Sequence, residues 1–503
     1  MGFKKFFGIS DPAPLRTDLD EKGQKKYHRS LAFQSFIAGT LGYSLYYVCR
    51  TSLNVMKKPI LESNTLQEFS INLPSVQFES FFNFDSWALC WESATIGPNT
   101  QLGIIGSVLL FAYAIGKLVN GFIADHCNIK RFMAAGLLVS TLANLTMGFI
   151  GLFGSHNEIV EKAMIPSLAV FIVFAIMWGV NGWSQSMGAP PAIIALSRWF
   201  PLSRRGTFYG FFSASHNIGE WLSFIFVGSI VAAAGWQWGF FGSALAGAIG
   251  VVIILFMMHD TPESKGLPSI EVLTGEKVEA KKKDESVGQI QKQVLRNYAV
   301  WVLALASAFM YISRYSLNSW GILFLQEEKG FDLETATFII SINALLGILG
   351  TVLAGWMSDV LFKGNRRIPA FVSGILLSIS YIIFIYGGNA YWVNILSMVL
   401  FGIAIGVLIA FLGGLMAVDI VPRKATGAAL GVVGMASYVA AGLQDVVSGW
   451  LIDSGKTEVV NELGETIIKY DFEYAGLFWI GASVISFLLP VLTWGKKVKN
   501  DEE

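Results

Sequence analysis

Two arginines stand within apolar stretches of this 503-residue sequence. Arg50 follows Tyr-Ser-Leu-Tyr-Tyr-Val-Cys, and Arg314 follows Tyr-Ile-Ser in a second apolar stretch. A guanidinium group presents a planar fork of N–H donors that fits the oxygens of a phosphate group, which a lysine ammonium cannot match. Two such groups that face one cavity would hold a phosphate dianion. The alternative is that each arginine pairs with a buried carboxylate, Glu220 or Asp445, and only joins helices.

Three tyrosines share the helical face of Arg50. Tyr43, Tyr46 and Tyr47 precede it by seven, four and three residues, and these spacings bring side chains to one side of an α-helix. They would form a polar stripe beside the arginine. We therefore predict that Tyr43 and Tyr47 line the binding site with Arg50.

Other ionisable side chains also fall inside apolar stretches, where a charge is costly and usually faces a cavity or a partner. Lys117 could bind the anion or extend to the surface along its aliphatic stem. His216 lies one turn before Glu220 and could bind a ligand or make a structural hydrogen bond. Glu220 and Asp445 are expected to be counter-ions of the cavity cations, because the cations outnumber them. Proton transport is their alternative role.

The elements that position these residues are transmembrane helices. Hydrophobic residues make up 53% of the chain and charged residues 14%, whereas soluble proteins carry about 25% charged residues. Apolar stretches near the roughly 20 residues that cross a bilayer recur along the chain, so an all-α membrane protein is predicted. We expect twelve transmembrane helices, at roughly 31–56, 100–123, 130–153, 165–196, 206–233, 237–258, 297–325, 335–360, 368–388, 391–416, 425–452 and 474–494.

Basic residues are distributed unequally over the two sides of these helices. Lysine and arginine gather before the first helix, between 265 and 296, and in the tail after 495. This asymmetry predicts that both termini are cytoplasmic by the positive-inside rule. The formal net charge is zero, so no excess of basic charge points to nucleic acid.

An internal repeat divides the chain into two similar halves. The segments Gly121-Phe-Ile-Ala-Asp125 and Gly355-Trp-Met-Ser-Asp359 each precede basic residues and are 234 residues apart. Two six-helix repeats related by an axis along the membrane normal enclose a substrate site at the bilayer midplane. Asp125 and Asp359 are predicted to pair with loop arginines and to bias conformational switching. The predicted segments are a cytoplasmic N-terminal segment (1–30), a first half (31–258) with an outer loop at 57–99, a cytoplasmic linker (259–296), a second half (297–494) and a cytoplasmic tail (495–503).

Further motifs run along nearly the whole chain. They include Gly116-Lys117, the stretch from Asn181 to Pro191, and His216-Asn-Ile-Gly. Together with the arginine segments they resemble the organophosphate:phosphate antiporters of the major facilitator superfamily, the bacterial hexose 6-phosphate and glycerol 3-phosphate carriers. The resemblance implies that the two arginines bind the phosphoryl group, with Lys117 and His216 in support, and that substrate exchanges for inorganic phosphate without covalent chemistry.

Four positions depart from the family pattern. Thr51 follows the first arginine where the family usually has lysine, and Ala344 aligns with a frequent glutamate. Asp445 stands about where hexose-phosphate carriers have a lysine, and Glu220 replaces a residue that is commonly glycine. These changes bear on the substrate and leave the family assignment intact.

The expected function is therefore transport of sugar phosphates, hexose 6-phosphate first, in exchange for phosphate by alternating access. The membrane would be the bacterial inner membrane. A glycerol 3-phosphate transporter and a membrane sensor of external sugar phosphate are the alternatives. A proton-coupled drug exporter does not account for two arginines at symmetric midplane positions.

An enzyme is not expected, because no nucleophile–base pair or metal cluster is predicted to face the cavity. The cysteines Cys49, Cys90 and Cys127 are scattered, and their spacing gives neither a disulfide framework nor a metal site. No cofactor and no metal are predicted. The expected partners are a small phosphorylated anion, inorganic phosphate and the lipid bilayer.

Overall fold

The computed structural model describes residues 7–71, 94–154, 165–274, 295–362, 365–421, 426–460 and 466–494. The predicted tail, most of the predicted linker and Cys90 lie outside these residues. The first group of helices is α2 (Glu21–Glu62), α3 (Pro98–Asp125), α4 (Ile129–Gly154), α5 (Ser167–Gln185), α6 (Ala189–Trp199), α7 (Leu202–Ser213), α8 (Ser215–Leu222), α9 (Gly228–Ala234) and α10 (Trp236–Met257). The later helices are α11 (Ile270–Thr274), α13 (Tyr298–Glu327), α14 (Leu333–Trp356), α15 (Arg367–Tyr386), α16 (Tyr391–Ala410), α17 (Met416–Val418), α18 (Thr426–Ser454) and α19 (Glu473–Leu488).

The described residues form long apolar helices, as predicted for an all-α membrane protein. Eleven of them, some joined end to end, are long and apolar enough to cross a bilayer. The predicted first span lies within α2, which is not among the eleven. Its apolar stretch is interrupted by Gln34 and three tyrosines, so its hydropathy is lower than that of the others.

The prediction that the first span ends at residue 56 was wrong. Helix α2 continues through Pro59 to Glu62, so Lys57 and Lys58 lie on the helix and not in the outer loop. The Lys57 ammonium pairs with Asp445 on α18, and the Lys58 ammonium pairs with Glu327 on α13. A single sequence does not reveal these partners on other helices. Beyond the helix, strands β1 (Phe69–Ile71) and β2 (Ala94–Ile96) pair antiparallel on the way to α3.

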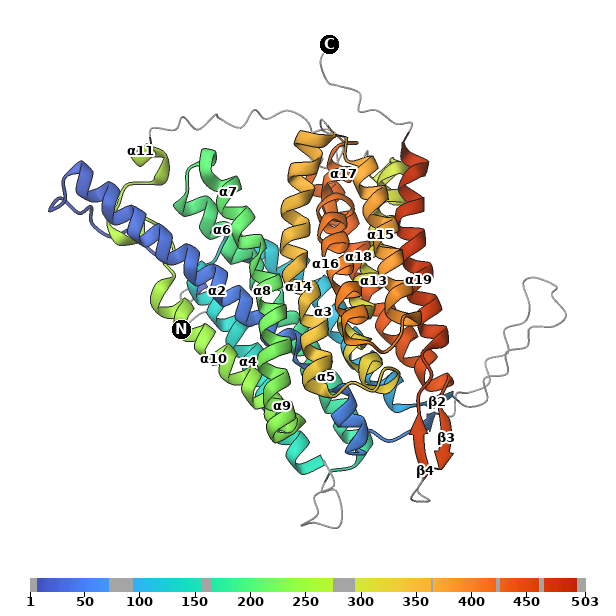
Figure 1. The fold of residues 1–503 in the computed structure, drawn as a ribbon. Coiled ribbons are helices and arrows are strands. Elements are labelled where there is room, and N and C mark those ends of the chain that lie inside the picture. The colour runs from blue at the N-terminus through green and yellow to red at the C-terminus, as the bar shows by residue number, and fades with distance from the viewer. Residues whose placement is uncertain are drawn as a thin grey trace, which may run out of the picture.

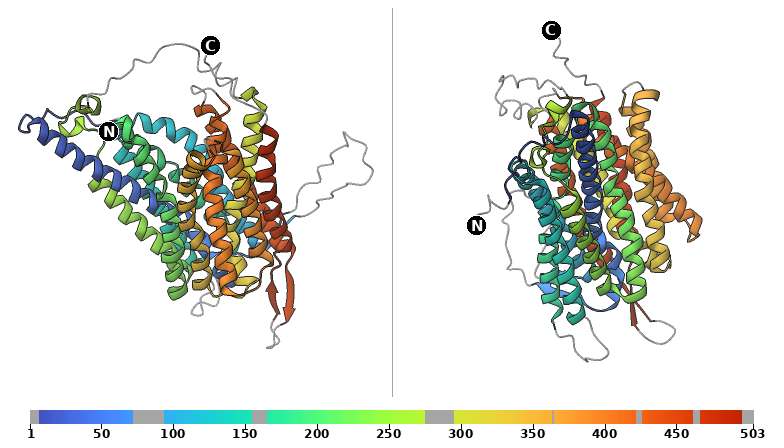
Figure 2. Two further views of the ribbon diagram at one scale, coloured as in Figure 1. Left: turned by 45° about the horizontal axis from the view of Figure 1, so that its top comes forward. Right: turned by 90° about the vertical axis from the view of Figure 1, so that its left-hand side faces the viewer.

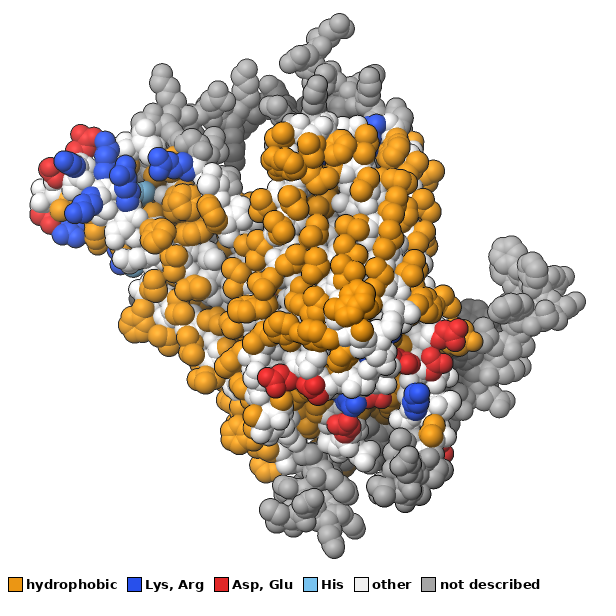
Figure 3. Space-filling view, in the orientation of Figure 1, with side chains coloured by type: hydrophobic (Ala, Val, Ile, Leu, Met, Phe, Trp, Pro, Cys, Tyr) orange, Lys and Arg blue, Asp and Glu red, His pale blue; other side chains and the backbone are white. Residues whose placement is uncertain are grey.

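The helices form two groups that approach each other toward the end of the molecule at which β2 lies and lean apart toward the opposite end (Figures 1 and 2). In the first group α10 packs on α2 and α4, and α5 packs on α3 and α4; in the second, α16 packs on α14 and α15, and α13 packs on α18 and α19. Helices α3 with α18, α8 with α14, and α2 with α13 join the groups. Hydrophobic side chains cover the middle of the face in Figure 3, and basic side chains gather at the start of α2.

The contact between α3 and α18 requires glycine at two positions of α3 and is joined by a carboxylate near the end of α18. A Cβ at Gly103 would lie 2.3 Å from the carbonyl oxygen of Asp445, and one at Gly106 would lie 1.9 Å from its Oδ2. Near the end of α18, Asp453 accepts hydrogen bonds from the backbone N–H of Asn99 at 3.2 Å and of Thr100 at 2.7 Å. A carboxylate at a helix N-terminus satisfies unpaired donors and the helix dipole. The two groups are therefore joined at the end of the molecule that carries β1 and β2. Strands β3 (Thr457–Val460) and β4 (Thr466–Lys469) form the hairpin there.

Candidate functional site

Arg50 is a buried cation among aromatic rings. Arg50 is 5% exposed, and its Nη2 donates a hydrogen bond to the hydroxyl of Tyr315 at 3.0 Å. Its Cζ lies 4.3 Å from the ring centroid of Tyr113 and 5.4 Å from that of Tyr47. Aromatic faces attract cations, but they neutralise no charge. Among the described residues no carboxylate forms an ion pair with Arg50, so its positive charge is available to an anion.

Arg314, on α13, does have a carboxylate partner. Its Nη2 lies 3.5 Å from Oε2 of Glu220 on α8, a long contact for an ion pair. The other oxygen of Glu220 accepts a hydrogen bond from Asn318 Nδ2 at 2.5 Å. All three side chains are buried. Glu220 thus links the two helix groups, and its role as a counter-ion stays a prediction.

Tyr315 and Tyr438 bring the cations together. The Cζ of Arg314 lies 5.7 Å from the ring centroid of Tyr315, whose hydroxyl accepts the hydrogen bond from Arg50. Across the cluster, Nζ of Lys117 lies 5.4 Å from the ring centroid of Tyr438, and Cζ of Arg50 lies 5.8 Å from the same ring. Lys117 is itself exposed at the surface of the helices, whereas the two arginines are buried. We call these side chains, with Tyr47 and Tyr113, the arginine–tyrosine cluster.

The predicted residues Tyr43 and His216 lie beside this cluster, next to Tyr47. The half-buried His216 ring lies 5.8 Å from the Tyr47 ring, and the Tyr43 ring lies 5.5 Å from that of Tyr47. Tyr46, which was predicted only to share the helical face of Arg50, donates a hydrogen bond from its hydroxyl to the carbonyl oxygen of Met133 at 2.6 Å. Tyr46 therefore joins α2 to α4, whereas Tyr43 and Tyr47 contact the site.

A second buried ion pair was missed by the sequence analysis. Lys57 is 1% exposed, and its Nζ lies 3.7 Å from Asp445 Oδ1 and 3.0 Å from Ser319 Oγ. The Ser319 hydroxyl donates to Asp445 Oδ1 at 2.6 Å, and the Lys57 ammonium sits 3.2 Å from the Trp320 ring centroid. The prediction that Asp445 pairs with Lys117 or the arginines was therefore wrong. The available signal was spacing, since Lys57 follows Arg50 by seven residues on the same helical face.

The predicted switch aspartates are separate from the cluster. Asp125 is exposed at the end of α3, without an ion pair among the described residues. The backbone of Asp359 lies in the π-helical segment Met357–Leu361, and its side chain is outside the description. Their pairing with loop arginines stays a prediction.

The cluster is suited to binding an oxyanion by hydrogen bonds and charge. Three cations converge on it, and Glu220 is the one carboxylate in the described residues that contacts any of them. No group of three or more histidine, cysteine, aspartate or glutamate side chains in the described ranges could hold a metal ion.

Comparison with known proteins gives a consistent set of relatives. The model of the Major Facilitator Superfamily matches residues 39–444. A probable hexose phosphate transport protein of Chlamydia pneumoniae is 30% identical over 99% of this chain and 98% of its own length. The glycerol-3-phosphate transporter of Bacillus subtilis is 28% identical over 98% of this chain and 99% of its own. The membrane sensor protein UhpC of Escherichia coli is 27% identical, over 87% and 88%.

Solved structures show the same fold at low sequence identity. A bacterial homologue of the human lysosomal transporter Spinster, solved inward-facing and unoccupied, has a TM-score of 0.64 to this chain. It is 14% identical and covers 92% of this chain and 95% of its own. At this identity the likeness concerns the arrangement of helices alone.

Proposed function

This chain belongs to the organophosphate:phosphate antiporter family of the major facilitator superfamily, and from that premise we propose that it carries sugar phosphates across a membrane. Hexose 6-phosphate is the first candidate, in exchange for inorganic phosphate. The observation that carries the proposal is the arginine–tyrosine cluster, in which Arg50 has no carboxylate partner in the described residues. A phosphoryl group would supply the missing negative charge.

In the proposed mechanism the phosphoryl group binds between Arg50 and Arg314. It takes the place of Glu220 at Arg314, where the present contact of 3.5 Å is long. Lys117, His216, Tyr43 and Tyr47 complete the wall. Without a bound anion the unneutralised cations oppose the approach of the two halves, which favours return with a phosphate load.

The proposed arrangement in the membrane follows the sequence. The six-helix halves are 31–258 and 297–494, and both termini are cytoplasmic in a bacterial inner membrane. The start of α2, where basic side chains gather (Figure 3), would then face the cytoplasm. A glycerol 3-phosphate transporter and a sensor of sugar phosphate remain the alternatives, and relatives of both kinds exist.

Counterflow in liposomes tests the proposal. Purified protein is reconstituted with internal unlabelled phosphate, and uptake of labelled phosphate, hexose 6-phosphate and glycerol 3-phosphate is measured. We expect uptake of hexose 6-phosphate that depends on internal phosphate. Preferred uptake of glycerol 3-phosphate would replace the substrate, and binding without any uptake would favour the sensor.

Replacing His216 with glutamine is expected to weaken substrate binding less than replacing either arginine. The half-buried ring lies against Tyr47, and glutamine keeps a polar group at that wall. We expect KM to rise about threefold to tenfold, the effect of one neutral hydrogen bond. Complete loss of binding would instead assign His216 a central role.

Replacing Glu220 with glutamine tests whether this carboxylate competes with the substrate. Exchange should survive, and KM for phosphate should fall about threefold to tenfold, because a charge-assisted contact to Arg314 is removed. The matched control is Glu327→Gln, which removes a carboxylate bound to Lys58 at 3.0 Å, distant from the cluster. Uptake driven by a proton gradient in the wild type and lost in Glu220→Gln would show that Glu220 carries protons.

A further inference from the structure

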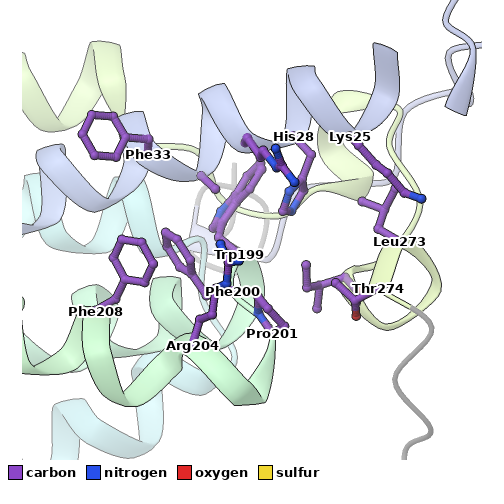
Figure 4. Close-up of a pocket in the computed structure, with 13 residues that line it drawn as sticks. Lys25, His28, Phe33, Trp199, Phe200, Pro201, Arg204, Phe208, Leu273 and Thr274 are labelled. Carbon is purple, nitrogen blue, oxygen red and sulfur yellow. The ribbon is translucent and has the colours of Figure 1, made fainter. Parts of the chain in front are cut away.

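A cavity of about 660 Å³ lies apart from the arginine–tyrosine cluster, between the start of α2, the connection from α6 to α7, and α11 (Figure 4). Helix α2 contributes Lys25, His28 and Arg29. The end of α6 contributes Trp199, and the first turn of α7 contributes Arg204. None of the roles argued above uses these residues. The cavity therefore requires an explanation of its own.

The lining of this cavity is basic. Lys25, Arg29 and Arg204 are exposed, and no aspartate or glutamate is among the lining residues. Lys25 has a surface contact with Glu21 one turn away, with Nζ 2.5 Å from Oε1, a type of pair that contributes little. Neither Arg29 nor Arg204 has an ion pair within the described residues. The cavity thus attracts anions.

His28 adds a buried polar group without a partner. The residue is 8% exposed, its ring lies 5.5 Å from that of Trp199, and its Nε2 has no hydrogen-bond partner among the described residues. The indole is fixed in turn, because its Nε1 donates to the carbonyl oxygen of His259 at 3.0 Å. A buried polar atom of this kind is stabilised when a ligand or water supplies the partner.

The other walls are aromatic. Phe33, Phe200 and Phe208 line the same cavity (Figure 4), and Phe33 is 57% exposed. Phe33 lies where the apolar part of α2 begins, and the basic side chains lie one and two turns before it. The pocket is therefore polar toward the start of α2 and apolar toward the middle of the helix, the order of a phosphate head group and its carbon chain.

We propose that this pocket binds the phosphate group of an organic phosphate, at a site separate from the transport site. Arg29, Arg204 and Lys25 neutralise the phosphate, and the aromatic walls contact the carbon atoms next to it. An anionic phospholipid of the cytoplasmic leaflet and a soluble phosphate ester offer the same chemistry. Binding would hold the start of α2 against α6 and α7, on the same helix that carries Arg50.

The test compares two double variants of the full chain that each remove two positive charges. Arg29→Gln/Arg204→Gln removes cations that line the pocket. Lys22→Gln/Lys26→Gln removes exposed cations of the same helix that do not line it. Native mass spectrometry measures binding of phosphatidylglycerol, with phosphatidylcholine as the zwitterionic reference. Equilibrium dialysis measures binding of labelled inorganic phosphate, in an Arg50→Lys/Arg314→Lys background that weakens the transport site.

We expect the pocket variant to lose affinity for phosphatidylglycerol about tenfold, because hydrogen bonds to charged groups are lost, and the control variant to retain it. A loss confined to labelled phosphate in the pocket variant would identify a soluble phosphate as the ligand, and loss of both probes would indicate a site open to either source. His28→Phe, which keeps an aromatic ring against Trp199, should reduce the same binding in part. The proposal would be overturned if the pocket variant and the control variant bound both probes equally, whether both variants retained binding or both lost it.

Discussion

Arg50→Lys and Arg314→Lys are each expected to abolish exchange of sugar phosphate while the protein still inserts into the membrane. Lysine keeps the charge, so the cation–aromatic contacts of Arg50 and the pairing of position 314 with Glu220 survive in part. The planar fork that would hold two phosphate oxygens is lost. Hydrogen bonds to charged groups contribute about 1.5–3 kcal/mol each, so we expect exchange to fall about a hundredfold or more.

The measurement is counterflow of labelled phosphate at equal amounts of reconstituted protein. Arg16→Lys is the matched control, because Arg16 is an exposed arginine paired with Asp18 outside the cluster. Near-normal exchange by either cluster variant would remove the phosphate clamp from the mechanism. Loss of exchange in the Arg16 variant as well would show that lysine substitution acts through general damage.

The second large effect is expected at the buried pair of Lys57 and Asp445. Asp445→Asn leaves the Lys57 ammonium, on a residue that is 1% exposed, without a counter-ion. Breaking a buried pair from one side costs about 3–5 kcal/mol, whereas replacing both charges is often neutral. We therefore expect Asp445→Asn and Lys57→Met each to be strongly destabilised, and Lys57→Met/Asp445→Asn to recover most of the stability.

Thermal unfolding of the solubilised protein and exchange activity measure this effect together. Asp18→Asn is the control, since it breaks an exposed pair worth about 0–1 kcal/mol. A single variant as stable as the wild type, or a double variant no better than either single one, would contradict the buried pair.

Several properties of this protein were determined by the sequence alone. Apolar stretches of bilayer length predicted the helices, because only a helix satisfies its own backbone donors and acceptors in lipid. Arg50, Arg314, Lys117 and Glu220 could be identified without a structure, because a charge within such a stretch is conspicuous. The motifs around them also predicted the family, which the comparisons confirm.

The partners of these residues were decided by the tertiary structure. Helical periodicity gives the face on which Arg50 lies but not the helix opposite, so Tyr113, Tyr315 and Tyr438 could not be chosen from many tyrosines. The same limit explains the error at Lys57, because a lysine near the end of an apolar stretch ordinarily lies at the interface with water. Its burial depends on Asp445, 388 residues away in the chain. Spacing within α2 puts Lys57 on the face of Arg50, but only packing brings the carboxylate of Asp445 to it.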